Sequence, residues 1–169
     1  MAFRVVIPIF PNVTQLDFTG PAQMFAKVPD LELCIAAKDA APVPTDSGFS
    51  VNAPYTFADC PAADLVCVPG GGGVIEAIQD PYFLSCVERQ CARARYVTSG
   101  VDFSLTVIAQ VFGEQIARLI QLSMQYNPQP PFESGHPSVA SETTVAQANA
   151  IYAQRAQAMR AALKGAKRS

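Results

Sequence analysis

Three loops of the 169-residue chain carry groups that could do chemistry. The first holds Asp17 between two large apolar residues, and a partly desolvated carboxylate can accept and donate protons. The second is the run Gly70–Gly73, because consecutive glycines let backbone N–H groups approach an anion or a developing oxyanion. The third holds Ser99 beside Gly100, at the kind of strand-to-helix elbow where α/β enzymes place a nucleophile.

Each of these loops also has a purely structural interpretation. Asp17 can cap the helix that begins beside it, and the local sequence alone favours that cap. The glycine run lacks the last glycine of a dinucleotide fingerprint and has no Gly-Lys-Ser/Thr motif, so a flexible turn is an equally good interpretation. Ser99 can cap the next helix, and the only histidine, His136, lies in a proline-rich segment, which disfavours a Ser–His pair.

The cysteines are odd in number, and no two of them have the spacing of a zinc or redox motif. We therefore expect no metal and no cofactor, and interpret the cysteines as buried, reduced thiols of a cytoplasmic protein. Cys67 lies closest in sequence to the glycine run, inside an apolar strand where its pKa should be ordinary or raised. The five are Cys34, Cys60, Cys67, Cys86 and Cys91.

The elements that must position these loops alternate between strand and helix. Apolar, β-branched segments predict four strands, over Arg4–Phe10, Leu31–Ala36, Leu65–Val68 and Tyr96–Thr98. The Pro- and Gly-rich stretch 43–57 predicts a hairpin or small excursion. Strands separated by helices predict parallel pairing, and the three loops then follow the carboxyl ends of strands, where ligands bind in such sheets.

Helices are predicted between these strands and after them. Asp80-Pro81 is a good helix start, and 103–112 is apolar nearly all round, which predicts a buried helix. The other helices are predicted over Leu16–Val28, after Gly113 with Leu119 on the apolar stripe, and over about Ser141–Leu163 with Tyr152 among the buried residues. We expect an α/β domain over residues 1–138, followed by a C-terminal helix and basic tail over 139–169.

Composition narrows the possible partners. The net charge is −2 with only 15% charged residues, so there is no electrostatic footprint for nucleic acid. No apolar stretch is long enough to span a membrane, and the first ten residues are more typical of a strand than of a signal peptide. We expect a protein that binds neither nucleic acid nor membranes.

Six short segments together resemble the bacterial isonitrile hydratases of the ThiJ/PfpI superfamily. The resemblance covers about Val5 to Pro137, and the segments are Gln15–Pro21, Phe57–Pro61, Cys67–Gly71, Ala94–Ser99, Gly100–Thr106 and Gln121–Phe132. It implies a doubly wound, flavodoxin-like sandwich with a mostly parallel sheet, of the class I glutamine amidotransferase type. It also implies a metal-free hydration of an isonitrile to an N-substituted formamide, through a cysteine thioimidate.

The resemblance assigns roles to several positions and exposes a gap. It implies that Asp17 transfers protons and that Gly71 and Gly72 offer backbone N–H groups. In the family, the segment after the matching serine carries a nucleophilic cysteine and a further block of several dozen residues, whereas here Ser99 joins Gly100 directly. Val101 then stands at the position of the cysteine. Because the block is missing, the sandwich is expected to be truncated, and because the cysteine is missing, we expect turnover near background.

Two other functions stay open beside a weak hydratase whose small-molecule substrate is an isonitrile. One is a non-catalytic interaction module that forms a homodimer or higher assembly, because a shortened sheet exposes a strand edge. The other is a transcription regulator, which is least favoured because a single C-terminal helix is too short for a helix-turn-helix pair.

Overall fold

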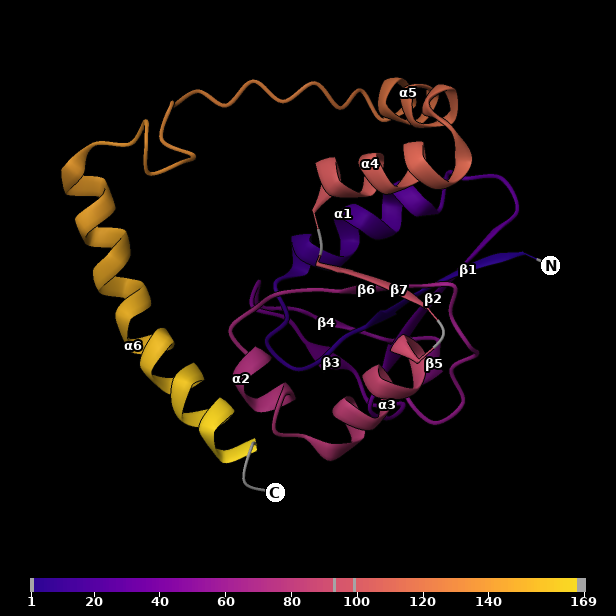
Figure 1. Cartoon of the computed structure of the whole chain (residues 1–169), viewed down its shortest axis with the longest axis horizontal. Helices are drawn as coiled ribbons and strands as arrows, with labels where there is room; N and C mark the ends of the chain where they lie inside the picture. The colour runs from indigo at the N-terminus through magenta and orange to yellow at the C-terminus, as the bar shows by residue number, and fades with distance from the viewer. Residues whose placement is uncertain (1, 93, 99, 167–169) are drawn as a thin grey trace. The chain divides into compact units, whose positions relative to one another are not determined.

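The computed structural model describes residues 2–92, 94–98 and 100–166, and gives only the backbone of 95–98, 154–155 and 165–166. Its central sheet has five parallel strands in the order β5-β2-β1-β6-β7 (Figure 1). They are β1 (Phe3–Pro8), β2 (Leu31–Ala37), β5 (Tyr55–Thr56), β6 (Leu65–Val68) and β7 (Arg95–Thr98). The predicted parallel α/β sheet is confirmed. The short β5 is an edge strand of this sheet, and the sequence pattern did not distinguish it from the rest of the excursion.

The middle of the sheet is the core. Val5, Val6 and Ile7 of β1 are fully buried, as expected for a strand that is covered on both faces. In the register of β1 with β2, Val6 lies opposite Cys34. Leu65 and Cys67 of β6 are likewise buried, so the thiols of these strands belong to the core.

Helices cover both faces of the sheet. α1 (Gln15–Phe25) packs on β1 and β2, and α4 (Val101–Phe112) packs beside α1. On the opposite face, α3 (Pro81–Cys91) packs on β6, with the short α2 (Val74–Ala77) before it (Figure 1). The predicted start of α3 is confirmed, because the Asp80 carboxylate accepts a hydrogen bond from the Tyr82 N–H over 2.9 Å and Pro81 occupies the first turn.

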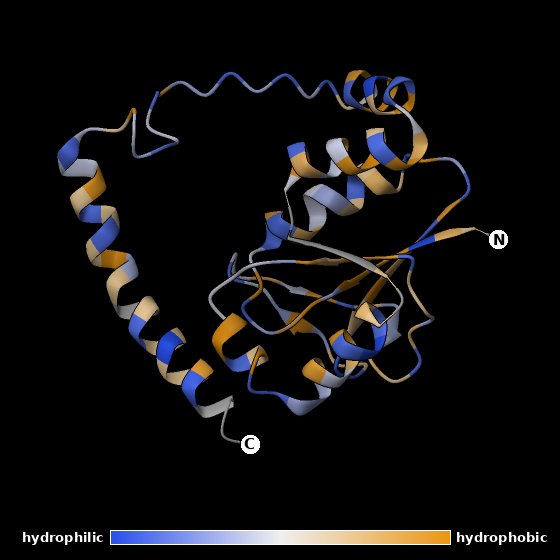
Figure 2. Cartoon of the chain, viewed as in Figure 1, coloured by the Kyte–Doolittle hydropathy of each residue, from blue (hydrophilic) through white to orange (hydrophobic). Residues whose placement is uncertain are grey.

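Two helices of this unit are less buried than predicted. α4 buries Ser104, Val107 and Ile108 but leaves Phe103 40% exposed, so the helix has one buried face instead of being enclosed. α5 (Glu114–Ser123) packs on α4 and mixes hydrophobic with hydrophilic residues (Figure 2). Its Leu119 is 66% exposed, which corrects the predicted stripe.

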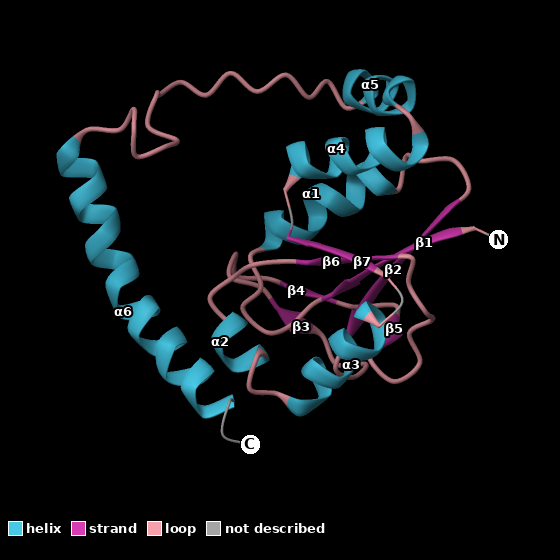
Figure 3. Cartoon of the chain, viewed as in Figure 1, coloured by secondary structure: helices cyan, strands magenta, loops and turns pink. Residues whose placement is uncertain are grey.

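The excursion between β2 and β6 forms a small second sheet. β3 (Val43–Pro44) and β4 (Ser50–Val51) pair antiparallel, which confirms the predicted hairpin (Figure 3). Gly48 has a φ of 84° in the connecting turn, a conformation that favours glycine. The chain then returns to the main sheet at β5.

The chain divides into two compact units, Met1–Gln125 and Tyr126–Ser169. The second contains an irregular proline-rich segment and α6 (Glu142–Ala166), whose first turn is capped by the Ser141 hydroxyl accepting from the Thr144 N–H over 3.2 Å. Tyr152 is 59% exposed, so its predicted burial is wrong. The expected domain boundary after residue 138 stays a prediction. Within the described residues, no helix has the length and apolar character needed to cross a membrane.

Candidate functional site

The loops that follow β1 and β6 meet where the sheet changes direction. The chain leaves β1 for β2 on one side and later returns to β6 on the other side of β1. In open α/β sheets, the crevice at the carboxyl ends of two such strands is the usual ligand site. Asp17 follows β1 and the glycine run follows β6, so the topology brings together the two loops that the sequence singled out.

A remote carboxylate holds the start of α1. Thr14 is the N-cap residue, but its hydroxyl donates to the Asp46 carboxylate over 2.7 Å instead of capping its own helix. Asp46 also accepts from the Gln15 N–H over 3.1 Å. The Thr14 hydroxyl and, next, the Gln15 N–H lower the pKa of Asp46 below its ordinary value. Asp46 therefore serves as the cap from outside the helix.

Asp17 lies in the first turn of α1 and is not the cap, so the capping interpretation favoured by the local sequence is wrong. Its carboxylate is half-buried and accepts a hydrogen bond from the backbone N–H of Gly70 over 3.2 Å. The Thr14 N–H donates to the Gly70 carbonyl over 3.0 Å, which ties the same two loops together a second time. These two hydrogen bonds fix the loop of Asp17 against the glycine run.

The glycines of the run differ in what surrounds them. Gly71 has a φ of 142° and pairs as an isolated antiparallel bridge with Val13, so its backbone lies tightly against the loop after β1. A Cβ on Gly73 would lie only 1.8 Å from the Pro11 carbonyl oxygen, so no larger residue fits there. Gly72 is exposed and open on its Cβ side. The flexible-turn interpretation does not describe Gly71 and Gly73, whose backbones are enclosed; the donor roles of Gly71 and Gly72 stay predictions.

Val101 opens α4 beside this site. A Cβ on Gly20 would lie 2.9 Å from Val101 Cγ2, so α4 approaches α1 closely at this glycine. Gly20 follows Asp17 by three residues on α1, and residues three apart lie on one helix face. The position expected for a nucleophile therefore lies against the α1 face that carries Asp17, one helical turn further along α1, and it holds an isopropyl group. Asp102 is exposed on the same helix.

All five thiols are free, and four of them are buried, with Cys91 half-buried. Burial is the main cause that raises the pKa of each one. For Cys67, burial and then the nearby Asp17 carboxylate raise the pKa to about 12. The expected ordinary or raised pKa of Cys67 is confirmed, and none of these thiols has the depressed pKa of an activated nucleophile.

The described structure does not place the other candidates relative to this site. Ser99 lies outside the described residues. His136 belongs to the second unit, where its Nδ1 lies 2.8 Å from the Ser138 hydroxyl. Within the described part of the chain, no group of three or more His, Cys, Asp or Glu side chains could hold a metal ion.

Sequence reasoning missed Asp46 and the Gly73–Pro11 contact. Asp46 lies in the excursion, 31 residues beyond the helix start that it caps, so no local pattern points to it. The available signal was the Asp-Ser-Gly turn, which marks a loop but does not say which helix it contacts.

The model of the DJ-1/PfpI family matches residues 3–105 of the chain. The isonitrile hydratase of Pseudomonas putida is 31% identical over 203 aligned positions, covering 88% of this chain and 89% of that protein. Because 203 aligned positions exceed the 169 residues of the chain, the alignment contains gaps on this chain's side.

Solved structures share the fold. A ThiJ/PfpI family protein from Pseudomonas syringae superposes with a TM-score of 0.91 at 21% identity, covering 96% of this chain and 90% of that one. Oxidized DJ-1 of Toxoplasma gondii superposes with a TM-score of 0.64 at 14% identity, covering 75% of this chain and 100% of that one. The expected class I glutamine amidotransferase-like sandwich is confirmed.

Proposed function

The chain belongs to the DJ-1/PfpI family, and from that membership we propose that it is an isonitrile hydratase scaffold with little or no hydratase activity. The proposal joins two observations. The chain is similar to an isonitrile hydratase along most of its length. Its structure also keeps an aspartate fixed against a glycine run, beside a valine that cannot act as a nucleophile.

The reaction explains why the valine matters. In hydration by covalent catalysis, a thiolate adds to the terminal isonitrile carbon, a C–S bond forms, and that carbon gains a proton to give a thioimidate. Water then adds to the same carbon, the C–S bond breaks, the nitrogen takes a proton, and the product is an N-substituted formamide. The thiolate is the group that makes the first addition fast, so a site without one keeps only the effects of binding and electrostatics.

One observation carries the proposal: Val101, at the position expected for the nucleophile, packs against Gly20 of α1. In addition, burial raises the pKa of every cysteine of the chain, so none of them is an activated substitute. Cys67 is the cysteine whose pKa responds to Asp17, but at a pKa of about 12 it holds its proton near neutral pH. The gaps in the alignment with the Pseudomonas putida enzyme support loss of a segment, which we place between Ser99 and Gly100.

The test is an assay of formamide production from cyclohexyl isonitrile. We expect the full chain to match the uncatalysed rate, and a variant that carries the family's nucleophile segment between Ser99 and Gly100 to exceed it by several orders of magnitude. In that restored variant, Asp17→Asn should abolish the gain, whereas Asp30→Asn on an exposed loop should leave it unchanged. Steady turnover by the natural chain that is lost on Asp17→Asn would overturn the proposal.

A second function, association without catalysis, is favoured by the edge of the sheet. Among the described strands, β7 pairs with β6 on one side and with no strand on the other. α5 exposes Leu119 and Leu122 at 66% and 76%. Unpaired edges and exposed apolar side chains promote pairing between copies, so we propose a homodimer or higher assembly. The free thiols fit a reducing compartment, and we propose the cytoplasm.

Light scattering coupled to size-exclusion chromatography tests the association. We expect a mass of at least two chains, and expect Leu119→Lys with Leu122→Lys to lower it, because the α5 face then loses its exposed apolar side chains. A stable monomer across a hundredfold range of concentration would count against association and would leave the hydratase test untouched.

A further inference from the structure

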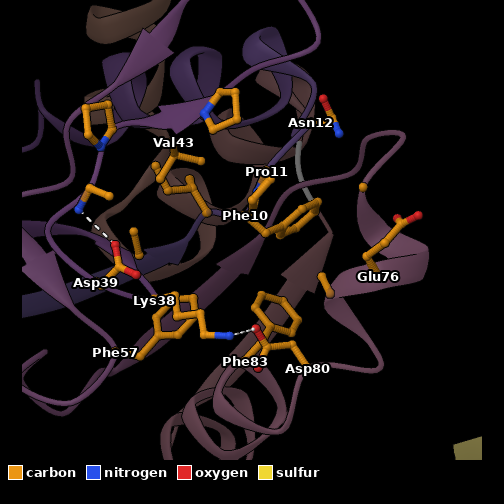
Figure 4. Close-up of a pocket in the computed structure, with 17 residues that line it drawn as sticks. Phe10, Pro11, Asn12, Lys38, Asp39, Val43, Phe57, Glu76, Asp80 and Phe83 are labelled. Atoms are coloured by element: carbon orange, nitrogen blue, oxygen red, sulfur yellow. Dashed lines mark hydrogen bonds and ion pairs between the residues drawn. The ribbon is translucent and has the colours of Figure 1, made fainter.

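A cavity of about 340 Å³ lies at the carboxyl ends of β1 and β2, on the α2–α3 side of the sheet (Figure 4). Ligand pockets have volumes of about 300–1,000 Å³, so the cavity suits a compact molecule with one ring or a short branched chain. Asn12, in the loop after β1, and Gly73, at the end of the glycine run, line this cavity, whereas Asp17 and Gly70 do not. It is therefore separate from the candidate catalytic site, and the inference does not depend on the proposed function.

Aromatic rings form the floor of this cavity. Phe10 and Phe83 meet edge to face with their centroids 5.4 Å apart, and Phe57 meets Phe83 at 5.9 Å. All three rings are nearly fully buried, at 3–5% exposure, so their positions are set by the core. Such a floor attracts apolar groups, and the faces of aromatic rings also attract cations.

Backbone hydrogen bonds join the loops that form the walls of the cavity. The Asn12 N–H donates to the Pro44 carbonyl over 2.8 Å, and the Gly73 N–H donates to the Asn12 carbonyl over 3.2 Å. Pro11 and Pro42 add segments with a fixed φ. Because the three loops are tied to one another, the cavity is formed before any ligand arrives.

The rim has excess negative charge. Lys38 and Asp80 neutralise each other across 2.8 Å, and the Lys38 ammonium also lies 4.7 Å from the centre of the Tyr82 ring. Asp39 and Glu76 then remain as rim carboxylates that the described ion pairs do not include, and Asp39 also accepts a hydrogen bond from the Ala41 N–H over 2.8 Å. An anionic ligand meets net repulsion at this rim, and a cationic one meets net attraction.

We propose that this cavity binds a small organic cation with an apolar body, an alkyl- or arylammonium ion. The apolar body lies against the rings of Phe10 and Phe83, and the ammonium group lies at the rim, where the carboxylates of Asp39 and Glu76, on opposite sides of the cavity, supply the negative charge (Figure 4). The aromatic floor provides affinity for the body, and the rim charge selects the cation over a neutral or anionic molecule of the same shape.

Three probes of nearly the same shape separate these contributions: phenethylamine, phenethyl alcohol and phenylacetate. Each is titrated into the ¹⁵N-labelled full chain while amide chemical shifts are followed. We expect phenethylamine to shift the amides of Ala37, Lys38 and Ala77, which line the cavity. Its Kd should be about fivefold lower than that of the alcohol, with phenylacetate weakest, and added salt should reduce the difference.

Matched variants locate the two contributions. Glu76→Gln should reduce the preference for the amine about twofold, whereas Glu88→Gln, on the exposed side of α3, should not. Ala77→Leu places a larger side chain in the floor and should weaken all three probes at least tenfold. If that variant does not fold, Ala41→Leu at the rim replaces it, with Ala26→Leu at the exposed C-cap of α1 as its control.

Two results would overturn the inference. One is the absence of shifts at the lining amides with any probe. The other is binding of phenylacetate as tight as that of phenethylamine, because the rim charge would then select nothing.

Discussion

The Asp17 carboxylate accepts a hydrogen bond from the Gly70 N–H across 3.2 Å, which joins residues 53 positions apart in the chain. A Cβ on Gly70 would lie 2.7 Å from the same carboxylate oxygen. The glycine is therefore required by the aspartate beside it. The acid and the backbone donor form one unit, so the effect of changing either residue on stability should depend on the other.

Gly70→Ala should lower the free energy of unfolding by about 1–3 kcal/mol, because the new methyl group collides with the Asp17 carboxylate. Urea denaturation measures this loss. Gly72→Ala is the matched control and should have little effect, since nothing lies within 4 Å of its Cβ position. In an Asp17→Ala background the cost of Gly70→Ala should shrink, and equal costs in both backgrounds would contradict the contact.

The effect of Gly20→Ala on the free energy of unfolding should change sign with the residue at position 101. In the natural chain the added Cβ would lie 2.9 Å from Val101 Cγ2, so we expect a loss of about 1 kcal/mol in the free energy of unfolding. In a Val101→Ala background the clash is gone, and the better helix propensity of alanine should give a gain of about 0.5–1 kcal/mol. Thermal and urea unfolding of the four chains measure both values. A destabilising Gly20→Ala in both backgrounds would mean that another contact sets the α1–α4 distance.

Cys67 should make the protein less stable in alkali. Burial, and then Asp17, raise its pKa from 9.0 to about 12, so the folded chain keeps a proton that the unfolded chain has lost. This contribution is fully present below pH 9.0 and is lost as the pH rises toward about 12. Its slope is at most about 1.4 kcal/mol per pH unit.

Urea unfolding of Cys67→Ala across that pH range should therefore give a flatter profile than the natural chain. Cys91→Ala is the control with the less buried thiol, and it should change the slope less. Identical slopes in the natural chain and Cys67→Ala would show that this thiol does not titrate differently in the folded and unfolded states.

Asp46→Ala should lower the melting temperature by removing the external cap of α1. The pKa of Asp46 is lowered mainly by the Thr14 hydroxyl, so its contribution is present above the ordinary value of 3.8 and is lost as the pH falls through the lowered pKa. Melting temperatures measured from neutral pH into acid should therefore converge for the natural chain and the variant. Asp39→Asn, in the preceding turn, should not reproduce that convergence.

Much of the fold was predictable from the sequence because its signals are local. The buried run of β6 is bounded by Pro69 and glycines, and its predicted span matches the structure residue for residue. The start of α3 follows from Asp80 and Pro81 in the same way. Exposure was harder: an apolar residue such as Leu119 resembles a core residue in sequence, but whether a neighbour covers it depends on tertiary packing.

The candidate site was predictable in its positions and less so in its contacts. The order of strands places the loops of Asp17 and Gly70 together, and this follows from parallel pairing alone. Asp17 contacts Gly70 instead of capping α1, and a second carboxylate, Asp46, accepts the hydrogen bond at the helix start. A contact between segments 31 residues apart leaves no periodic trace in either segment.

The external cap links the stability of the start of α1 to that of the β3–β4 hairpin. The first turn of α1 takes a hydrogen-bond acceptor from a loop that is made later in the chain and is shaped by the β3–β4 hairpin. Native-state hydrogen exchange at the Gln15 amide should therefore follow the opening of that hairpin and not the fraying of the helix. The position of Asp17, in the first turn of the same helix, therefore depends on a hairpin from another part of the chain.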